Sequence, residues 1–272
     1  MARHRTTGTV APTGRPMEAT ATAGRIRSSG LAASFGGRAR RRDAVYYSPS
    51  AHVGFAHYTK TAGTSLQHWF RRVLPDGELL ERENPHLPVV VALDRVMVER
   101  PPSGWRRLFA GRRHAAAPRP PLIVGVIRDP FEMLVSLYEY WRRHAFPVEP
   151  EAPFILAARH GPFPEFLRMA VVDGQAPTYE WFFDVGGRAW SRTRLLDFAT
   201  IDVGLRLVAR EFGIDDPPPL ERRNAATAGR RDLDAYRLAA GDLLAEVQRH
   251  FRWYYDEGLA VAVGAGRATR AA

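Results

Sequence analysis

The chain has 272 residues, no Cys and 45% hydrophobic residues, which suffices for one large domain or two small ones with a buried core. The absence of Cys excludes disulfides, thiolate metal sites and cysteine nucleophiles. No run of 18 or more apolar residues occurs, so we expect no membrane-spanning helix.

The formal net charge of +10 lies almost entirely in the two ends of the chain. Residues 1–43 contribute +7, Arg267 and Arg270 contribute +2, and the rest is nearly neutral. A nucleic-acid-binding domain carries its basic charge on the folded body, so this distribution disfavours one. A nucleic-acid role for the basic tail remains an alternative, with steeply salt-dependent binding as its signature. We expect a disordered tail over 1–43, one domain over 44–262 and a flexible tail over 263–272.

Two strand–turn–helix units are predicted along the body. Residues 53–58 favour a short strand, and apolar residues from Leu66 to Val73 repeat at helical spacing after it. Residues 121–127 are almost continuously apolar, as in a strand buried on both faces. Asp129, Pro130 and Glu132 then match an N-cap, a first helical residue and a capping box.

The remaining segments add further predicted elements. We expect a surface excursion over 94–120, a strand over 193–201, and helices over 166–172, 203–212 and 232–255, the last as one long amphipathic helix. The aromatic residues between 147 and 190 fit a hydrophobic core, or alternatively a sugar-stacking pocket. Strands alternating with helices predict an α/β fold of three layers, with a mostly parallel sheet flanked by helices.

Two of the predicted turns carry candidate binding residues. The turn over 59–66 contains Lys60, the only Lys in the chain, followed by Thr61, Ala62, Gly63, Thr64 and Ser65. A turn that leaves a strand and opens a helix presents unpaired N–H groups to an anion. Its alternative is an ordinary turn with a surface Lys, since Thr59 replaces the second Gly of a Walker A loop.

The second candidate pair is Arg128 and Ser136. Arg128 lies where the second buried strand meets its helix, the edge at which open α/β sheets bind ligands. Ser136 follows two turns into that helix. The alternative reading is a salt-bridging Arg and a small packing residue. A third, basic segment over 221–231 contains Asn224.

Together these motifs resemble the sulfotransferases that use PAPS (3′-phosphoadenosine 5′-phosphosulfate), in their carbohydrate-type branch. The turn Tyr58-Thr59-Lys60-Thr61-Ala62-Gly63-Thr64-Ser65-Leu66 is similar to the family's P-K-T-[GA]-G-T-S-L loop. The segment from Arg128-Asp129-Pro130 through Ser136 and Tyr138 is similar to its R-D-P…S-x-Y motif. The chain departs from the family pattern with Thr59 for Pro and Ala226 for the frequent Ser or Thr.

The resemblance implies a P-loop-kinase-like sulfotransferase fold and transfer of a sulfuryl group from PAPS to a hydroxyl or amine. The acceptor would be a carbohydrate, a glycolipid or a small molecule. It further implies that Lys60 contacts the bridging oxygen, that residues 61–65 hold the 5′-phosphate, and that Arg128 and Ser136 hold the 3′-phosphate. Asn224 would lie in the closing loop. No metal is implied, and without the anchor of Golgi-type relatives we expect a cytoplasmic protein.

A base must accept the proton of the acceptor, and His is the usual choice near neutral pH. His86 is favoured, since carbohydrate-type relatives have a His at about this distance after the loop, with Glu83 as the carboxylate alternative. We expect His57 to point into or across a strand and His68 to lie on a helix surface. Two other functions stay open: a non-catalytic nucleotide-binding protein on this scaffold, and a nucleotide-dependent kinase.

Overall fold

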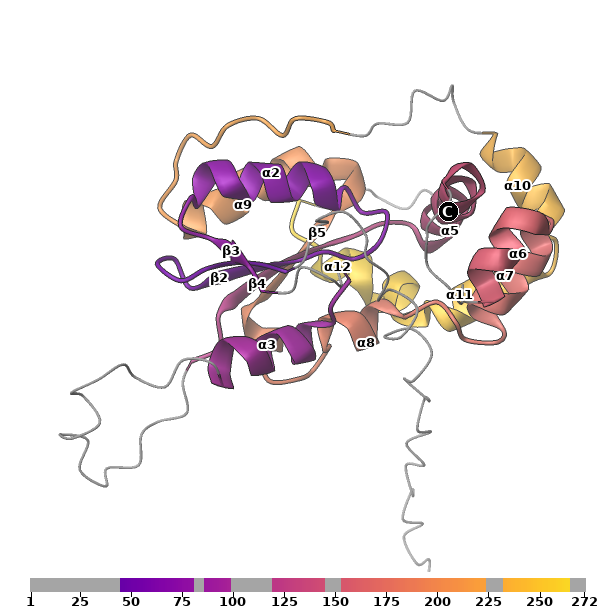
Figure 1. Cartoon of the computed structure of the whole chain (residues 1–272), viewed down its shortest axis with the longest axis horizontal. Coiled ribbons are helices and arrows are strands. Elements are labelled where there is room, and N and C mark those ends of the chain that lie inside the picture. Colours follow the sequence, from indigo (N-terminus) through magenta and orange to yellow (C-terminus); the bar gives the residue numbers. More distant parts are fainter. Residues whose placement is uncertain (1–44, 81–85, 99–118, 145–152, 224–231, 265–272) are drawn as a thin grey trace, which may run out of the picture.

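A computed structural model describes residues 45–80, 86–98, 119–144, 153–223 and 232–264. The chain forms an α/β structure around a five-stranded sheet (Figure 1). The strands are β1 (Tyr46–Ser48), β2 (Val53–Ala56), β3 (Glu78–Leu79), β4 (Leu122–Ile127) and β5 (Thr193–Asp197), in the order β3-β1-β2-β4-β5. Within the described ranges no helix is both long and apolar enough to cross a bilayer.

The sheet is mixed, which corrects the expectation of a mostly parallel one. Strands β2, β4 and β5 pair in parallel, as the alternation of strands and helices predicts. Strands β1 and β3 instead add an antiparallel edge to β2. Two- and three-residue strands contain too little alternation to be recognised in the sequence, so this edge was not predicted.

Helices cover both faces of the sheet and give the three expected layers (Figure 1). On one face, α2 (Gly63–Val73) and α9 (Ile201–Glu211) pack on Leu122, Val124 and Val126 of β4. On the other face, α3 (Val89–Val98) and α8 (Tyr179–Phe183) pack on the side that bears Ile123. Alternate residues of β4 therefore enter two separate cores, and this explains its unbroken apolar run.

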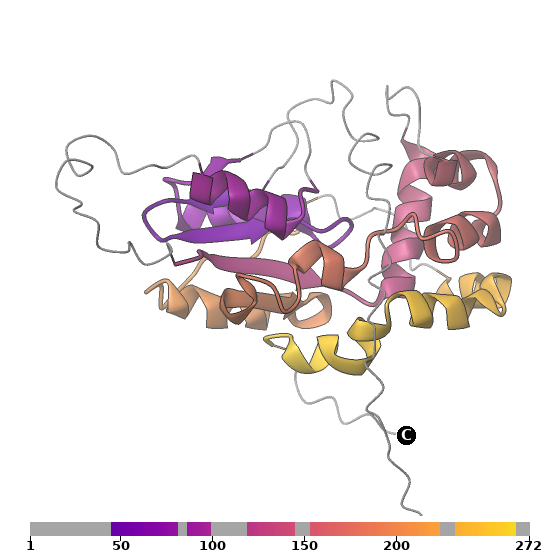
Figure 2. The same ribbon diagram turned by 90° about the horizontal axis from the view of Figure 1, so that it is seen from below.

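A group of helices stands at the carboxyl end of β4 (Figure 2). Helix α5 (Pro130–Arg143) follows β4 directly and contacts α6 (Pro153–His160), α7 (Phe163–Val171), α10 (Leu233–Ala240) and α11 (Leu243–His250). The aromatic residues expected to form core largely do so, since Phe166, Tyr179, Phe182 and Phe183 are buried. Among the described residues of this range, Trp190 is half-buried and Trp181 is 41% exposed.

The carboxyl-terminal segment differs from the single helix predicted over 232–255. Helix α10 ends at Gly241, whose φ of 52° and ψ of −129° leave the helical region. After α11 the chain continues through the π-helical turn η3 (Tyr254–Gly258) into the short helix α12 (Leu259–Val261). Val263 then forms a parallel bridge with Leu196, which extends the sheet beyond β5.

Other predicted boundaries shift by a few residues. Residues 193–201 hold a strand only as far as Asp197, because a 3-10 turn, η2 (Phe198–Thr200), leads into α9. Part of the expected surface excursion over 94–120 belongs to α3, which extends to Val98. The strand–turn–helix units at β2–α2 and β4–α5 match their predictions closely.

Candidate functional site

The turn between β2 and α2 has an unusual backbone conformation. Lys60 and Ala62 both have positive φ values, 58° and 61°, which L-residues adopt at a cost of about 1–2 kcal/mol each. The backbone therefore enters the left-handed region twice just before the first N–H groups of α2. Turns of alternating hand point successive N–H groups toward one concavity that suits an anion.

Side chains of the same turn are tied into the surrounding structure. The Thr61 hydroxyl donates to the carbonyl oxygen of Tyr58 at 2.8 Å, so Thr61 braces the turn from inside. Ser65 Oγ accepts a hydrogen bond of 2.8 Å from the backbone N–H of Arg223. Thr64 is half-buried in the first turn of α2. The Thr61 and Ser65 hydroxyls are therefore engaged by backbone groups of the protein itself.

The segment that ends at Arg223 lies along α2. Trp69 Nε1 donates to the carbonyl oxygen of Pro218 at 2.7 Å, and Glu221 forms an ion pair of 2.8 Å with Arg72. His68 lies 3.3 Å from the Glu221 carboxylate, on the partly exposed side of the helix as expected. The segment therefore lies beside the turn at Ser65. Asn224 itself, like Glu83, lies outside the described residues.

Position 63 has no room for a side chain, because the His57 ring lies against it. A Cβ built at Gly63 would lie 1.7 Å from Nε2 of His57. The buried His57 ring thus fills the space beside Gly63. Sequence alone gives no sign of this contact, because His57 precedes the turn and was expected to point into or across a strand.

His86 reaches the same turn from a distant part of the chain. Its ring lies 4.9 Å from that of His57 in an edge-on arrangement, and its Nδ1 lies 3.1 Å from the His57 carbonyl oxygen. A carbonyl only accepts, so Nδ1 carries the proton and the ring's lone pair is on Nε2. Burial, followed by the nearby charge of Lys60, lowers the pKa of His86 to about 4, although the hydrogen bond to His57 opposes this. The imidazole is therefore neutral at physiological pH.

Arg128 is held in place at the end of β4. Its backbone N–H donates to the Tyr179 hydroxyl at 3.2 Å, and that hydroxyl donates to the Arg128 carbonyl oxygen at 2.7 Å. Its guanidinium lies 4.6 Å from the Phe198 ring and pairs with Glu132 at 3.0 Å. Nε of Arg128 is buried and has no hydrogen-bond partner among the described residues. The Nε–H of this guanidinium is thus a buried donor that the described residues leave unsatisfied.

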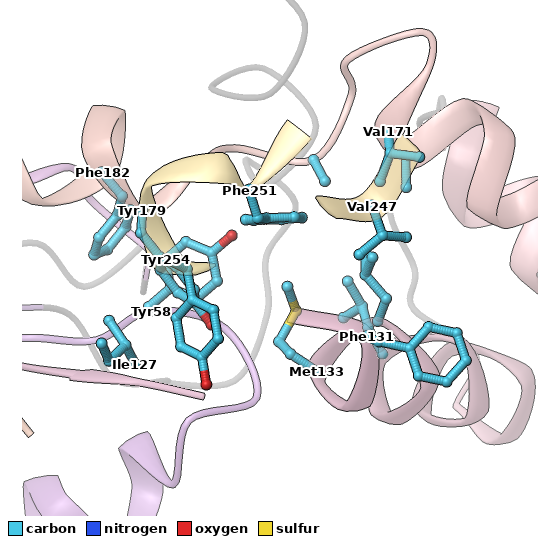
Figure 3. Close-up of a cluster of buried hydrophobic side chains, with 14 of the residues drawn as sticks. Tyr58, Ile127, Phe131, Met133, Val171, Tyr179, Phe182, Val247, Phe251 and Tyr254 are labelled. Carbon is cyan, nitrogen blue, oxygen red and sulfur yellow. The ribbon is translucent and has the colours of Figure 1, made fainter. Parts of the chain in front are cut away.

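Buried tyrosine rings pack at the Arg128 end of the candidate site. Figure 3 shows Tyr58, Tyr179 and Tyr254 gathered beside Ile127, the last residue of β4. The Tyr58 and Tyr179 rings lie 4.7 Å apart, and those of Tyr179 and Tyr254 lie 5.8 Å apart. Burial raises the pKa of each of these phenols, so they act as neutral hydrogen-bonding groups. Tyr179 was not predicted as a site residue, and its separation of 51 residues from Arg128 leaves no local signal.

One face of α5 connects the two motifs. Glu132, Ser136 and Tyr140 are spaced four residues apart and so share a helix face. Arg128 contacts Glu132 at one end of this stripe, and Lys60 Nζ lies 4.1 Å above the Tyr140 ring at the other. Eight residues of helix separate the two ends by about 12 Å. Ser136, which is buried, lies midway.

Besides Tyr179, the motif analysis did not identify Glu132 and Tyr140 as functional candidates. Only one of the two hydrogen bonds of the predicted capping box is seen. Asp129 Oδ1 accepts from the Glu132 N–H at 2.9 Å, whereas the Glu132 carboxylate pairs with Arg128. Tyr140 could have been found from its four-residue spacing to Ser136. Within the described part of the chain, no group of three or more His, Asp or Glu side chains is arranged to hold a metal ion.

Searches of protein-family models, curated proteins and solved structures found no match for this chain. The contacts described above define a candidate anion site at the carboxyl ends of β2 and β4, which are adjacent parallel strands. It combines a turn of alternating hand, two cations on one helix face and a neutral imidazole.

Proposed function

We propose that the chain is a PAPS-dependent sulfotransferase. The observation that carries the proposal is that Lys60 and Arg128 follow neighbouring parallel strands and contact the two ends of one stripe on α5. A donor with a 5′-phosphosulfate and a 3′-phosphate needs two separate anion-binding centres joined by one surface. Open α/β sheets bind nucleotides at this edge.

The chain's own residues divide the work of binding. The N–H groups at the start of α2 face the 5′-phosphate, and the Lys60 ammonium neutralises charge on the oxygen that leaves sulfur. Arg128, with its unshared Nε, binds the 3′-phosphate with Ser136 beside it. Lys suits the leaving oxygen because its ammonium is a compact, rotatable point charge.

The reaction moves a sulfuryl group between two oxygens. A bond forms between sulfur and the acceptor oxygen while the bond from sulfur to the phosphate oxygen breaks. His86 Nε2 accepts the proton that the acceptor loses, and Nδ1 keeps its proton on the His57 carbonyl. Because the pKa of His86 is about 4, the imidazole is already in its basic form at neutral pH.

Ligand-dependent thermal unfolding tests the proposal. At 100 times its dissociation constant, the product nucleotide PAP (adenosine 3′,5′-bisphosphate) should stabilise the fold by about 2.7 kcal/mol. For a domain of this size, the midpoint should rise by about 5–10 °C. Lys60→Ala should remove the shift, and Arg168→Ala, on the exposed side of α7, should keep it.

Three results would contradict the proposal. A cooperative transition that PAP does not shift would mean that the turn is not a nucleotide site. An equal shift with ATP that depends on magnesium would favour the kinase. A PAP shift with no release of PAP from PAPS, across a panel of carbohydrate and small-molecule acceptors, would favour a non-catalytic nucleotide-binding protein.

A further inference from the structure

A polar cavity lies at the opposite end of the parallel strands from the candidate anion site. It has a volume of about 680 Å³ and is formed where β4 and β5 begin, beside Leu122 and Ser191. Cavities of about 300–1,000 Å³ hold small ligands in proteins. Lys60 and Arg128 follow the other ends of β2 and β4, so the six residues of β4 separate the two sites by about 20 Å.

Arginine dominates the wall of this cavity. Four guanidinium groups line it, and one carboxylate, Glu211, joins them. The arginines are Arg119, Arg188, Arg192 and Arg194. Two of these arginines form ion pairs with carboxylates: Arg194 with Glu211 at 3.0 Å, and Arg188 with Asp94 at 2.8 Å. Among the described residues, the four arginines and the two carboxylates paired with them leave an excess of two positive charges at the cavity.

Arg192 is the least satisfied of the four. Its Nε is buried and has no hydrogen-bond partner in the described part of the chain. Burial, and then the charges of Arg119 and Arg194, lower its pKa, although Glu211 partly opposes them. Like charges brought this close are stabilised when an anion binds between them. Guanidinium forks match the paired oxygens of phosphate and sulfate groups.

We propose that this cavity binds a small molecule that carries two or more phosphate or sulfate groups. One such group faces Arg192 and Arg119, and a second faces the rim at Arg188. The excess of two positive charges matches a ligand with at least two negative ones. The site stands apart from the proposed donor site and does not depend on it.

Calorimetric titration of the full chain at fixed salt tests this site with two probes, tripolyphosphate and a trisulfated heparin disaccharide. Loss of a charge-assisted hydrogen bond should weaken binding about tenfold or more in Arg192→Gln and in Arg188→Gln. Glu211→Gln removes the opposing carboxylate and should tighten binding. Arg168→Gln removes an exposed Arg on α7 and should change affinity less than about twofold.

The variants separate this site from other anion-binding parts of the chain. Probe binding at the turn before α2 should weaken in Lys60→Ala, so the binding that persists in that variant and falls in Arg192→Gln belongs to this cavity. Whichever probe binds more tightly identifies the ligand as a phosphate or a sulfate ester. Equal affinities of the parent chain, Arg188→Gln and Glu211→Gln would overturn the proposal even if Arg192→Gln did not fold. Absence of binding by either probe at about 1 mM would overturn it as well.

Discussion

The imidazole of His57 occupies the space that a side chain at position 63 would need. Gly63→Ala would drive a methyl group to within 1.7 Å of that ring, and overpacking of this kind costs about 1–3 kcal/mol. We expect the unfolding midpoint of Gly63→Ala to fall by roughly 2–12 °C. Differential scanning calorimetry measures this change.

The double variant identifies the cause of that loss. If the clash with His57 is responsible, Gly63→Ala should cost much less in a His57→Ala background than in the parent chain. Additive effects of the two substitutions would mean that Gly63 matters for another reason.

His86 should make stability depend on pH in a defined window. Its pKa is lowered in the folded chain to about 4 from the ordinary value of 6.5, so only the unfolded chain takes up the proton between those values. Stability is then complete above about pH 6.5 and falls toward pH 4, by about 3 kcal/mol from this group. Urea unfolding at several pH values measures the slope.

A non-titrating variant isolates the contribution of His86. His86→Gln should flatten the curve between pH 4 and 6.5. Part of the slope should persist, because burial also lowers the pKa of His250, which bonds to the carbonyl oxygen of Ala176. An unchanged slope in His86→Gln would show that His86 titrates normally in the folded protein.

Helix α5 carries half of the candidate site, so its start must be well defined. The Asp129 carboxylate accepts the N–H of Glu132, and Pro130 takes the first helical position. Loss of this cap in Asp129→Ala should cost about 1 kcal/mol of stability.

A matched substitution separates the cap from the charge of Asp129. Asp129→Asn keeps the accepting oxygen, and burial already raises the pKa of the carboxyl, so this variant should stay close to the parent. Chemical denaturation compares the three chains. A loss in Asp129→Asn as large as that in Asp129→Ala would mean that charge rather than capping holds the helix start.

The elements that sequence predicts best are those with a local signal. Residues 122–127 combine a continuous apolar run with a following cap, and both β4 and α5 form where expected. The carboxyl-terminal helix was predicted too long because apolar spacing continues past Gly241, whereas the backbone at that Gly leaves the helical region. The apolar spacing on both sides of Gly241 does not reveal that the helix is interrupted at this residue.

At the scale of the molecule, the site depends on contacts between distant segments. His57 and His86 meet across 29 residues, Tyr179 grips Arg128 across 51, and Arg223 reaches Ser65 across 158. The sequence predicted that Lys60 and Arg128 would follow buried strands. It could not predict that Tyr140 of α5 contacts Lys60 or that Glu132 of α5 contacts Arg128. These contacts depend on how α5 packs against the sheet, which the local sequence does not indicate.

The carboxyl and amino ends of the parallel strands β2, β4 and β5 form two edges of the sheet that carry different chemical groups. The carboxyl edge combines Lys60, Arg128 and a neutral imidazole, while the amino edge presents the arginine-lined cavity. The near neutrality of residues 44–266 conceals this separation, because local excesses of positive charge are balanced elsewhere on the body. Net charge alone therefore indicates neither site.

The most direct test of the account compares PAP with 5′-AMP, which lacks the 3′-phosphate, on the parent chain and on Arg128→Lys. If Arg128 binds that phosphate, the parent should prefer PAP by roughly tenfold to a hundredfold, and Arg128→Lys should lose most of this preference while binding AMP as before. Lys60→Ala should weaken both nucleotides alike. A preference for PAP that survives in Arg128→Lys, or no preference in the parent, would contradict the assignment of the two anion centres.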